Sequence, residues 1–389
     1  MSYEFLIDLA LILLVSKIFS ILSKDAKLPK VLGAMVAGLV LGPSMLGWIH
    51  ETDFIAQLAK LGVIVIMFSA GLDVNLKQIK EVFKSSFLIA LLGVLCPVAL
   101  GVGAMVLYNG TYNLEALFIG IIFTATSVAI SVETLRELGK LNSKVGNAIL
   151  AAAVIDDVLG VIALSFGMAA AGEGFNIWMT LLKIALFFVL AIITGVIIAK
   201  AFEWYVERFN RDMRRFTTFA FVYCLVMAYV SEVYFGLSAI IGAFVAGLVI
   251  SNNHEEEYIA KKIEVLSYLI FSPMFFASIG LQVQISEFGM NTLILALIFI
   301  GVAVLSKIIG CAIGAICCKY SMKESIQIGI GMVGRGEVVL ILANKALEMG
   351  VITTQSFTAI IIAVIFCAII TPILLKLSFK KEIKEENSK

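Results

Sequence analysis

Apolar residues recur in runs of about 17 to 25 from one end of the chain to the other, with short polar segments between them. A helix of about 20 apolar residues crosses the hydrocarbon core of a bilayer. The pattern predicts an all-α membrane protein with thirteen transmembrane helices, near residues 4–23, 30–46, 58–73, 86–108, 114–133, 145–170, 178–200, 216–232, 237–251, 263–281, 291–317, 325–346 and 356–376. The first run lacks a basic flank and a cleavage signature, so it is predicted to be a retained span.

The composition agrees with this prediction and excludes several classes of function. Hydrophobic residues make up 61% of the chain and charged residues 15%, whereas soluble domains carry roughly 45–50% apolar residues. The net charge of +1 leaves no electrostatic footprint for nucleic acid. The six cysteines lie in or beside apolar runs without the spacing of metal ligands, so no metal centre or cofactor is predicted.

The basic residues separate by loop. Alternate loops, with the C-terminal tail, hold 23 of the 29 Lys and Arg residues, and the other six loops hold none. Because cytoplasmic loops carry the excess of Lys and Arg, the N-terminus is predicted outside and the C-terminus inside, with an odd number of spans between them. The chain is thus expected to be a multi-pass protein of the cytoplasmic membrane, in contact with lipid.

An internal repeat is visible in two pairs of segments. Residues 32–41 match residues 241–250 at seven of ten positions, which sets Gly33 against Gly242 at an offset of 209. Gly71 and Gly280, each followed by Leu, share that offset. The offset equals seven predicted spans, and an odd shift reverses the orientation in the membrane, so these are inverted repeats, typical of secondary transporters.

The repeats divide the chain, which is predicted to form a single transmembrane transporter unit. Residues 1–170 are the first six-helix repeat and residues 216–376 the second, with the span at 178–200 as a linker helix. Residues 377–389 are expected to form a short charged cytoplasmic tail. In such transporters the substrate binds near the midplane, where discontinuous helices of the two repeats cross.

Five ionisable residues lie near the middle of predicted spans, where each costs about 2.5–3.5 kcal/mol unless it is paired or wet. They are Asp156, Asp157, Lys307, Arg335 and Glu337. Neighbouring residues on a helix point about 100° apart, so the two aspartates are expected to divide their roles. One should pair with Lys307, while the other faces the ion path and holds either a proton or a cation.

Hydroxyls interrupt the fifth span at Thr124, Thr126 and Ser127. Ser and Thr often only hydrogen-bond back to their own helix, but the offset maps residues 124–127 onto the glycine-rich residues 333–336, which include Arg335. Both helices are therefore predicted to be interrupted and to cross near the midplane. Thr126, Ser127 and Glu337 should lie beside Asp157, where their hard oxygen atoms suit Na+, with Asp157, Ser127 and Thr126 as its ligands.

The sequence leaves two roles open for Arg335. It can neutralise helix C-terminal ends or an acid near the ion path, or it can belong to a buried ion-pair network that only fixes helix packing. The second role also suits the pair of Asp156 with Lys307. The aspartates have no counterparts in the second repeat, because the offset places Phe366 opposite Asp157.

At these residues the sequence resembles the monovalent cation:proton antiporter 2 family, near its bacterial NapA-type and GerN-like sodium/proton antiporters. The resemblance covers nearly the whole chain, and its most specific parts are Thr124–Ser127, Ile155–Asp157, Lys307 and Gly334–Val338. It implies the NhaA/NapA-like fold, with Asp157 as the carrier of cation and proton and Asp156 paired with Lys307.

The resemblance further implies a homodimer with an elevator-like movement of the helices that hold the site. The paired aspartates imply electrogenic exchange of Na+, or Li+, for H+. A K+/H+ or mixed Na+/K+ antiporter stays open, because oxygen-lined sites differ in size more than in residue type. An intramembrane aspartyl protease is disfavoured, since it needs aspartates on two different spans, and a passive channel is a further alternative.

Overall fold

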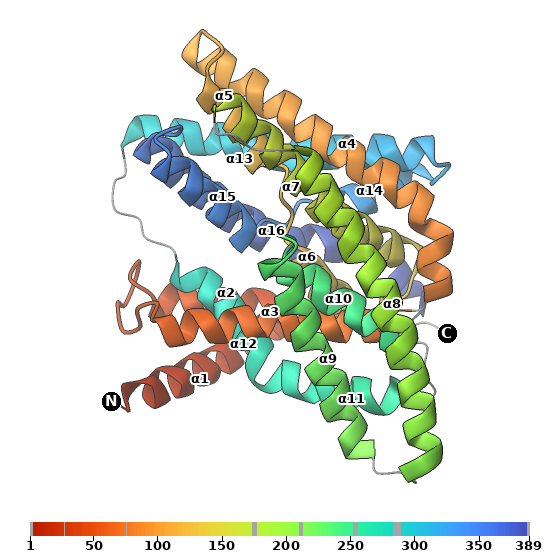
Figure 1. The fold of residues 1–389 in the computed structure, drawn as a ribbon. Coiled ribbons are helices and arrows are strands. Elements are labelled where there is room, and N and C mark those ends of the chain that lie inside the picture. The colour runs from red at the N-terminus through yellow and green to blue at the C-terminus, as the bar shows by residue number, and fades with distance from the viewer. Residues whose placement is uncertain are drawn as a thin grey trace.

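The structure is a computed structural model that describes residues 3–26, 28–74, 76–172, 177–209, 213–251, 256–282 and 289–386. Every regular element among these residues is helical (Figure 1). The helices are α1 (Glu4–Asp25), α2 (Lys30–Leu41), α3 (Asp53–Asp73), α4 (Leu76–Asn109), α5 (Leu114–Ile122), α6 (Val128–Glu137), α7 (Lys144–Ala170), α8 (Ile177–Phe209), α9 (Met213–Val233), α10 (Ala239–Ile250), α11 (Glu256–Leu266), a π-helical turn η1 (Ser267–Phe271), α12 (Ser272–Leu281), α13 (Met290–Cys317), α14 (Met322–Gly331), α15 (Glu337–Glu348) and α16 (Thr354–Glu386).

The distribution of polar and apolar side chains is that of a membrane protein. Among the described residues, nine helices are long and apolar enough to cross a bilayer, and α2 and α10 are shorter apolar helices. Large apolar side chains lie exposed along α1 and α8, whereas Asp156, Lys307 and Arg335 are fully buried. The chain is therefore a multi-pass, all-helical membrane protein.

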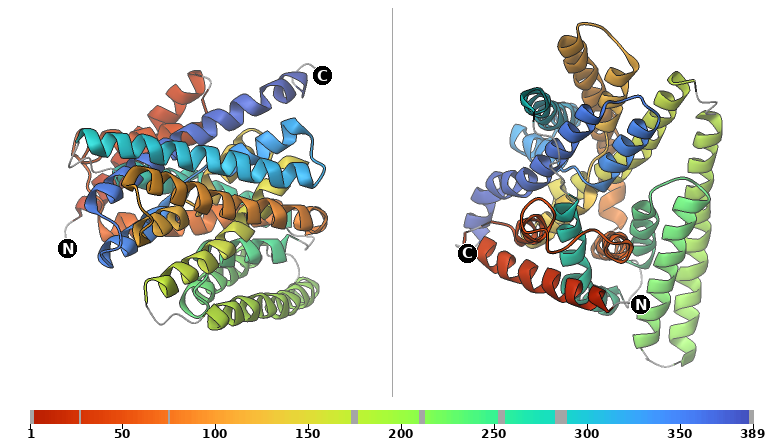
Figure 2. Two further views of the ribbon diagram at one scale, coloured as in Figure 1. Left: turned by 90° about the horizontal axis from the view of Figure 1, so that it is seen from above. Right: turned by 90° about the vertical axis from the view of Figure 1, so that its left-hand side faces the viewer.

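The helices gather into two bundles. The site bundle consists of α4–α7 and α13–α16, and the frame bundle of α1–α3 and α9–α12 with η1. In Figure 1 the site bundle lies above the frame bundle, and α8 runs diagonally across the front of both, in contact with α7 and α10. The right-hand view of Figure 2 shows α8 and α9 side by side at one edge of the molecule. Apart from α8, the main contacts between the bundles join α6 to α2 and α3, and α16 to α2.

Several predicted helix ends were wrong, for two physical reasons. The helix expected at 30–46 ends at Leu41, because Pro43 disfavours helical backbone at Gly42. The helix expected from 86 begins at Leu76, and the last helix continues to Glu386 through most of the predicted tail. Hydropathy reports where the bilayer ends, whereas a helix continues into water as long as its backbone hydrogen bonds persist.

The helix bounds repeat at the offset found in the sequence. Helix α10 begins and ends 209 residues after α2, at Ala239 and Ile250 against Lys30 and Leu41. The interruption after Ile122 likewise corresponds to the one after Gly331. The two halves of the chain thus place helices and breaks at equivalent positions.

Glycines set two tight helix crossings in the frame bundle. Helix α2 crosses α12 where Gly38 meets Gly280, and a Cβ on Gly38 would lie 1.9 Å from a backbone carbonyl oxygen of α12. Helix α3 crosses α10 where Gly71 meets Gly247, and a Cβ on Gly71 would lie 2.3 Å from a carbonyl oxygen of α10. The offset pairs Gly38 with Gly247 and Gly71 with Gly280, so the two crossings are equivalent contacts between the halves of the chain.

Candidate functional site

Two helices of the site bundle are interrupted, and their interruptions touch. Residues 123–127 separate α5 from α6, and residues 332–336 separate α14 from α15. The backbone N–H of Ser127 donates a hydrogen bond to the carbonyl oxygen of Gly334 at 2.8 Å. The Thr126 hydroxyl donates to the carbonyl of Met332 at 3.4 Å, and the Ser131 hydroxyl donates to that of Gly331. These bonds hold the unwound segments together.

The glycines of the second interruption permit this approach. A Cβ on Gly336 would lie 2.9 Å from the Ser127 hydroxyl oxygen, and one on Gly334 would lie 3.3 Å from the Ser127 carbonyl oxygen. The N-cap residues of α6 and α15, Ser127 and Gly336, make no side-chain cap hydrogen bond. Because the first N–H groups and last carbonyls of a helix lack partners within it, the meeting point concentrates polar backbone groups inside an apolar bundle.

Arg335 neutralises the C-terminal end of α5. Its guanidinium is fully buried and donates to the carbonyl oxygens of Thr124, at 3.4 Å, and of Ala125. It also donates to the carbonyl oxygen of Ala303 on α13 at 3.2 Å and approaches the Thr126 hydroxyl at 3.5 Å. A helix C-terminus carries about half a negative charge, so a cation there is stabilised without an acid as its partner.

Lys307 and Asp156 form an ion pair between α13 and α7. The Lys307 ammonium donates to Oδ1 of Asp156 at 2.7 Å, and both side chains are completely buried. Gly93 on α4 lies beside this pair. A Cβ there would make an ordinary contact with Lys307 Nζ at 3.6 Å but would clash with Sγ of Cys311 at 2.7 Å. Two opposite charges removed from water are tolerable only when they neutralise each other in this way.

Asp157 follows Asp156 on α7 and is 8% exposed. The neighbouring Asp156 carboxylate interacts with Thr126 and with Arg335 as well as with Lys307. Thr126 and Ser127, predicted as ligands beside Asp157, are buried at the interruption, and the structure brings Thr126 to Asp156. Their grouping around Asp157 stays a prediction. The side chain of Glu337 lies outside the described residues, although its backbone begins α15.

Among the described residues, no three His, Cys, Asp or Glu side chains gather closely enough to hold a metal ion. Carboxylate, hydroxyl and carbonyl oxygens are the groups available, and these suit hard cations.

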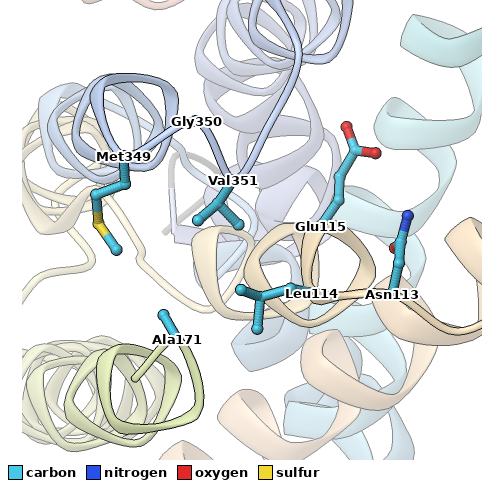
Figure 3. A pocket seen from close by; sticks show the side chains of 7 residues that line it. All are labelled: Asn113, Leu114, Glu115, Ala171, Met349, Gly350 and Val351. Carbon is cyan, nitrogen blue, oxygen red and sulfur yellow. The ribbon is translucent and has the colours of Figure 1, made fainter. Parts of the chain in front are cut away.

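A separate cavity of about 460 Å³ opens at the far ends of α5, α7 and α15 (Figure 3). Its lining is Asn113, Leu114, Glu115, Ala171, Met349, Gly350 and Val351. The rise of a helix places it about 20 Å along α7 from Asp157. The Glu115 carboxylate accepts from the Ser356 hydroxyl at 2.7 Å, so it serves to close the end of the site bundle.

Sequence reasoning assigned no role to three features of this region. Gly93 lies beside the ion pair. The Ala303 carbonyl accepts from Arg335, and the Ser131 hydroxyl donates to the Gly331 carbonyl at the start of the second interruption. A backbone carbonyl carries no sequence signal, and a single glycine in an apolar helix does not reveal what it makes room for. Ser131 stood close to the hydroxyl cluster, and its spacing of four residues from Ser127 was a usable signal.

Comparison with known proteins gives a consistent result. The family described as sodium/hydrogen exchanger, transmembrane, matches residues 10–381. The chain is 39% identical over 381 residues to the Na(+)/H(+)-K(+) antiporter GerN of Bacillus cereus, and the match covers 97% of each protein. It is 35% identical over 382 residues to a Na(+)/H(+) antiporter of Enterococcus hirae, covering 97% of this chain and 99% of that protein.

A solved structure shares the fold. The sodium proton antiporter MjNhaP1 from Methanocaldococcus jannaschii superposes with a TM-score of 0.77 at 18% identity, covering 99% of this chain and 98% of that one. The similarity therefore extends over the whole arrangement of helices in both bundles.

Proposed function

The chain belongs to the sodium/hydrogen exchanger family of monovalent cation:proton antiporters, and we propose that it exchanges Na+ for H+ across the cytoplasmic membrane. Asp157 is the group that binds the cation and the proton in turn. The observation that carries this proposal is the division of roles between two adjacent acids. Asp156 is held by Lys307 at 2.7 Å, whereas Asp157 is the next residue of α7 and lies about 100° around that helix from it.

The charges around the site explain how Asp157 can bind a proton and a cation in turn. Lys307 neutralises Asp156, and the carbonyl groups at the end of α5 accept from Arg335. Asp157 adds one negative charge to this balanced set, which a proton or a monovalent cation compensates equally well. Competition of the two ions for one carboxylate couples their movements in opposite directions. The Thr126 and Ser127 oxygens complete the cation site, with Glu337 beside it.

We assign thirteen spans to the membrane, with the N-terminus outside and the C-terminus inside. The interrupted stretches α5–α6 and α14–α15 count as one span each, as does α11–α12, and α8 is the linker. Two inverted repeats, at 1–170 and 216–376, are supported by the helix bounds at an offset of 209 and by the equivalent glycine crossings. The two interrupted spans cross at Ser127 and Gly334.

The site bundle moves as a body against the frame bundle in an elevator-like cycle. The proposal draws support from the sparse contact between the bundles, which is concentrated on α6 and α16. The frame bundle, with its exposed apolar helix α1, provides the surface for a homodimer. The bacterial relatives support placement in the cytoplasmic membrane.

Potassium is the second candidate substrate, because the name of the GerN relative includes both Na+ and K+. Li+ fits the same oxygen ligands. The pair formed by Asp156 and Lys307 favours electrogenic exchange, since two ionisable groups beside Asp157 allow more than one proton to move per cation.

Transport in proteoliposomes tests the proposal. A pH-sensitive dye inside the vesicles should report proton movement driven by Na+ or Li+ gradients, and K+ gradients measure the alternative. Asp157→Asn should abolish exchange, whereas the exposed acid Asp53, changed to Asn, should leave it intact. Exchange by Asp157→Asn at the wild-type rate would remove Asp157 from the mechanism. Repeating the assay with an imposed voltage tests electrogenicity.

A further inference from the structure

Charged side chains join the two bundles at the end that carries the Lys- and Arg-rich loops. Arg136 of α6 donates through Nε to the Asp73 carboxylate of α3 at 3.1 Å, and its Nη2 lies 2.9 Å from the same oxygen. The side chains of Arg136 and Asp73 are only 16% and 31% exposed. Glu133, one turn earlier on α6, accepts from Nη1 at 3.1 Å and fixes the guanidinium.

A second contact lies beside this ion pair. Both carboxylate oxygens of Glu137, the last residue of α6, accept from the backbone N–H of Lys30 at 2.9 and 2.7 Å. Lys30 is the first residue of α2, so Glu137 places a negative charge at a helix N-terminus. Helix α2 belongs to the frame bundle and α6 to the site bundle. The N-terminus of α2 is therefore capped by a residue of the other bundle.

The equivalent positions at the opposite end of the molecule are built differently. The offset of 209 sets Lys30 against Ala239, the first residue of α10. The backbone N–H of Ala239 is also capped by a carboxylate, at 2.8 Å, but that carboxylate is Glu232 of α9, in the same bundle. The position equivalent to Glu137 is Ala346, which has no carboxylate.

The ion pair has no counterpart there either. The offset sets Asp73 against Gln282 and Arg136 against Lys345. The Gln282 amide donates to Glu51 at 2.8 Å, within the frame bundle, and Lys345 is exposed on α15. Among the described residues at this end, no ion pair joins the site bundle to the frame bundle.

We propose that Asp73, Arg136, Glu137 and the N-terminus of α2 form a one-sided latch that favours the conformation closed at the cytoplasmic end. The inference rests on the proposed alternating-access function, in which inverted repeats exchange their arrangements between the two conformations. In the other conformation Gln282 and Lys345 would take the places of Asp73 and Arg136. A neutral amide cannot form the ion pair, so the conformation closed at the opposite end is less stable than the one closed at the cytoplasmic end. The equilibrium therefore favours the state described here.

Hydrogen–deuterium exchange of the full chain in lipid nanodiscs tests the latch. Arg136→Gln should move the ratio of the two conformations by about tenfold, within the usual range of conformational coupling. Deuterium uptake should rise in residues 28–36 and 132–142, at the cytoplasmic end, and fall in residues 237–245 and 341–352, at the opposite end. A contact with a merely local structural role would raise the first uptake and leave the second unchanged, and that result would overturn the proposal.

A graft supplies the converse test. Gln282→Glu removes the hydrogen bond to Glu51 and offers Lys345 a carboxylate, so with the natural latch intact it should protect the opposite end and loosen the cytoplasmic end. Gln282→Ala, which offers no carboxylate, should neither protect the opposite end nor loosen the cytoplasmic end. Lys144→Gln is the matched control for Arg136→Gln, because it breaks the pair with Glu324 inside the site bundle and should shift neither end.

The transport assay separates this proposal from the function on which it rests. If the wild type exchanges cations for protons and Arg136→Gln shows no reciprocal change, the latch is wrong and the function stands. If the reciprocal change appears in a protein that transports neither Na+ nor K+ against protons, the latch stands and the proposed function is wrong.

Discussion

Replacing Lys307 with alanine would leave the Asp156 carboxylate buried without its cation. The two side chains are completely buried, and the bond between Nζ and Oδ1 measures 2.7 Å. Removing one partner of such a pair costs about 3–5 kcal/mol, because the remaining charge has lost its compensation in a medium that cannot solvate it. Neutralising both partners costs much less, since no charge is then left buried.

The expected change in melting temperature follows from the size of the protein. An unfolding entropy of about 2.1 cal/mol/K per residue, applied to 389 residues, gives about 0.8 kcal/mol per degree. Lys307→Ala should therefore lower the melting temperature by about 4–6 °C. The double variant Lys307→Gln with Asp156→Asn should melt within about 2 °C of the wild type.

Thermal unfolding in dodecyl maltoside, followed by fluorescence-detected size-exclusion chromatography, measures both variants. Lys60→Ala is the control, because Lys60 is an exposed lysine of α3 and its loss should not change the melting temperature. Equal melting temperatures for Lys307→Ala and the double variant would refute the reasoning, since the lone acid would then cost no more than a neutral pair.

Two further predictions concern packing and pH. Gly93→Ala should destabilise the protein and slow transport, because the new Cβ would lie 2.7 Å from Sγ of Cys311. Adding Cys311→Ala should restore both the melting temperature and the transport rate, measured in the same melting and dye assays. If neither recovers, the clash lies elsewhere. Glu382, beyond the last span, loses solvation by burial, which raises its pKa, but bonds from Lys323 and Gln327 outweigh this and lower the pKa below its usual value. Its stabilising effect should be present at neutral pH and lost as the pH falls through that lowered pKa. The melting temperature of Glu382→Gln should therefore be slightly below that of the wild type at pH 7 and equal to it at a pH below the lowered pKa. A difference that persists in acid would contradict that assignment.

The coarse architecture was accessible from the sequence because lipid imposes simple rules. Apolar runs must be long enough to span, and a break in such a run must be satisfied inside the protein. The interruptions at 123–127 and 332–336 coincide with polar and glycine-rich breaks in apolar runs, and the repeat offset in the sequence pairs these two segments. The end of α2 at Leu41 was missed although Pro43 signalled it, because hydropathy outweighed backbone geometry in placing that boundary.

The contacts of the buried charges were only partly accessible. The need for an opposite charge indicated that one of the two adjacent aspartates pairs with Lys307, and the family resemblance identified that aspartate as Asp156. Neutralisation of a helix C-terminal end was one of two interpretations of Arg335, but its particular partners could not be named, since they are backbone carbonyls, which every residue carries. Arg136 was counted only as one of many cations that set the orientation. Its contact with Asp73 depends on how two bundles dock, which no local pattern encodes.

The dependence of Na+ affinity on pH tests most directly whether one carboxylate serves both ions. Solid-supported-membrane electrophysiology on the wild type gives the half-saturating Na+ concentration at each pH. If H+ and Na+ compete for Asp157, that concentration should rise about tenfold for each unit of pH below the pKa of the carboxyl group, while the maximal current at saturating Na+ is retained. A half-saturating concentration that stays constant across the range would contradict the account, because the two ions would then bind at separate sites.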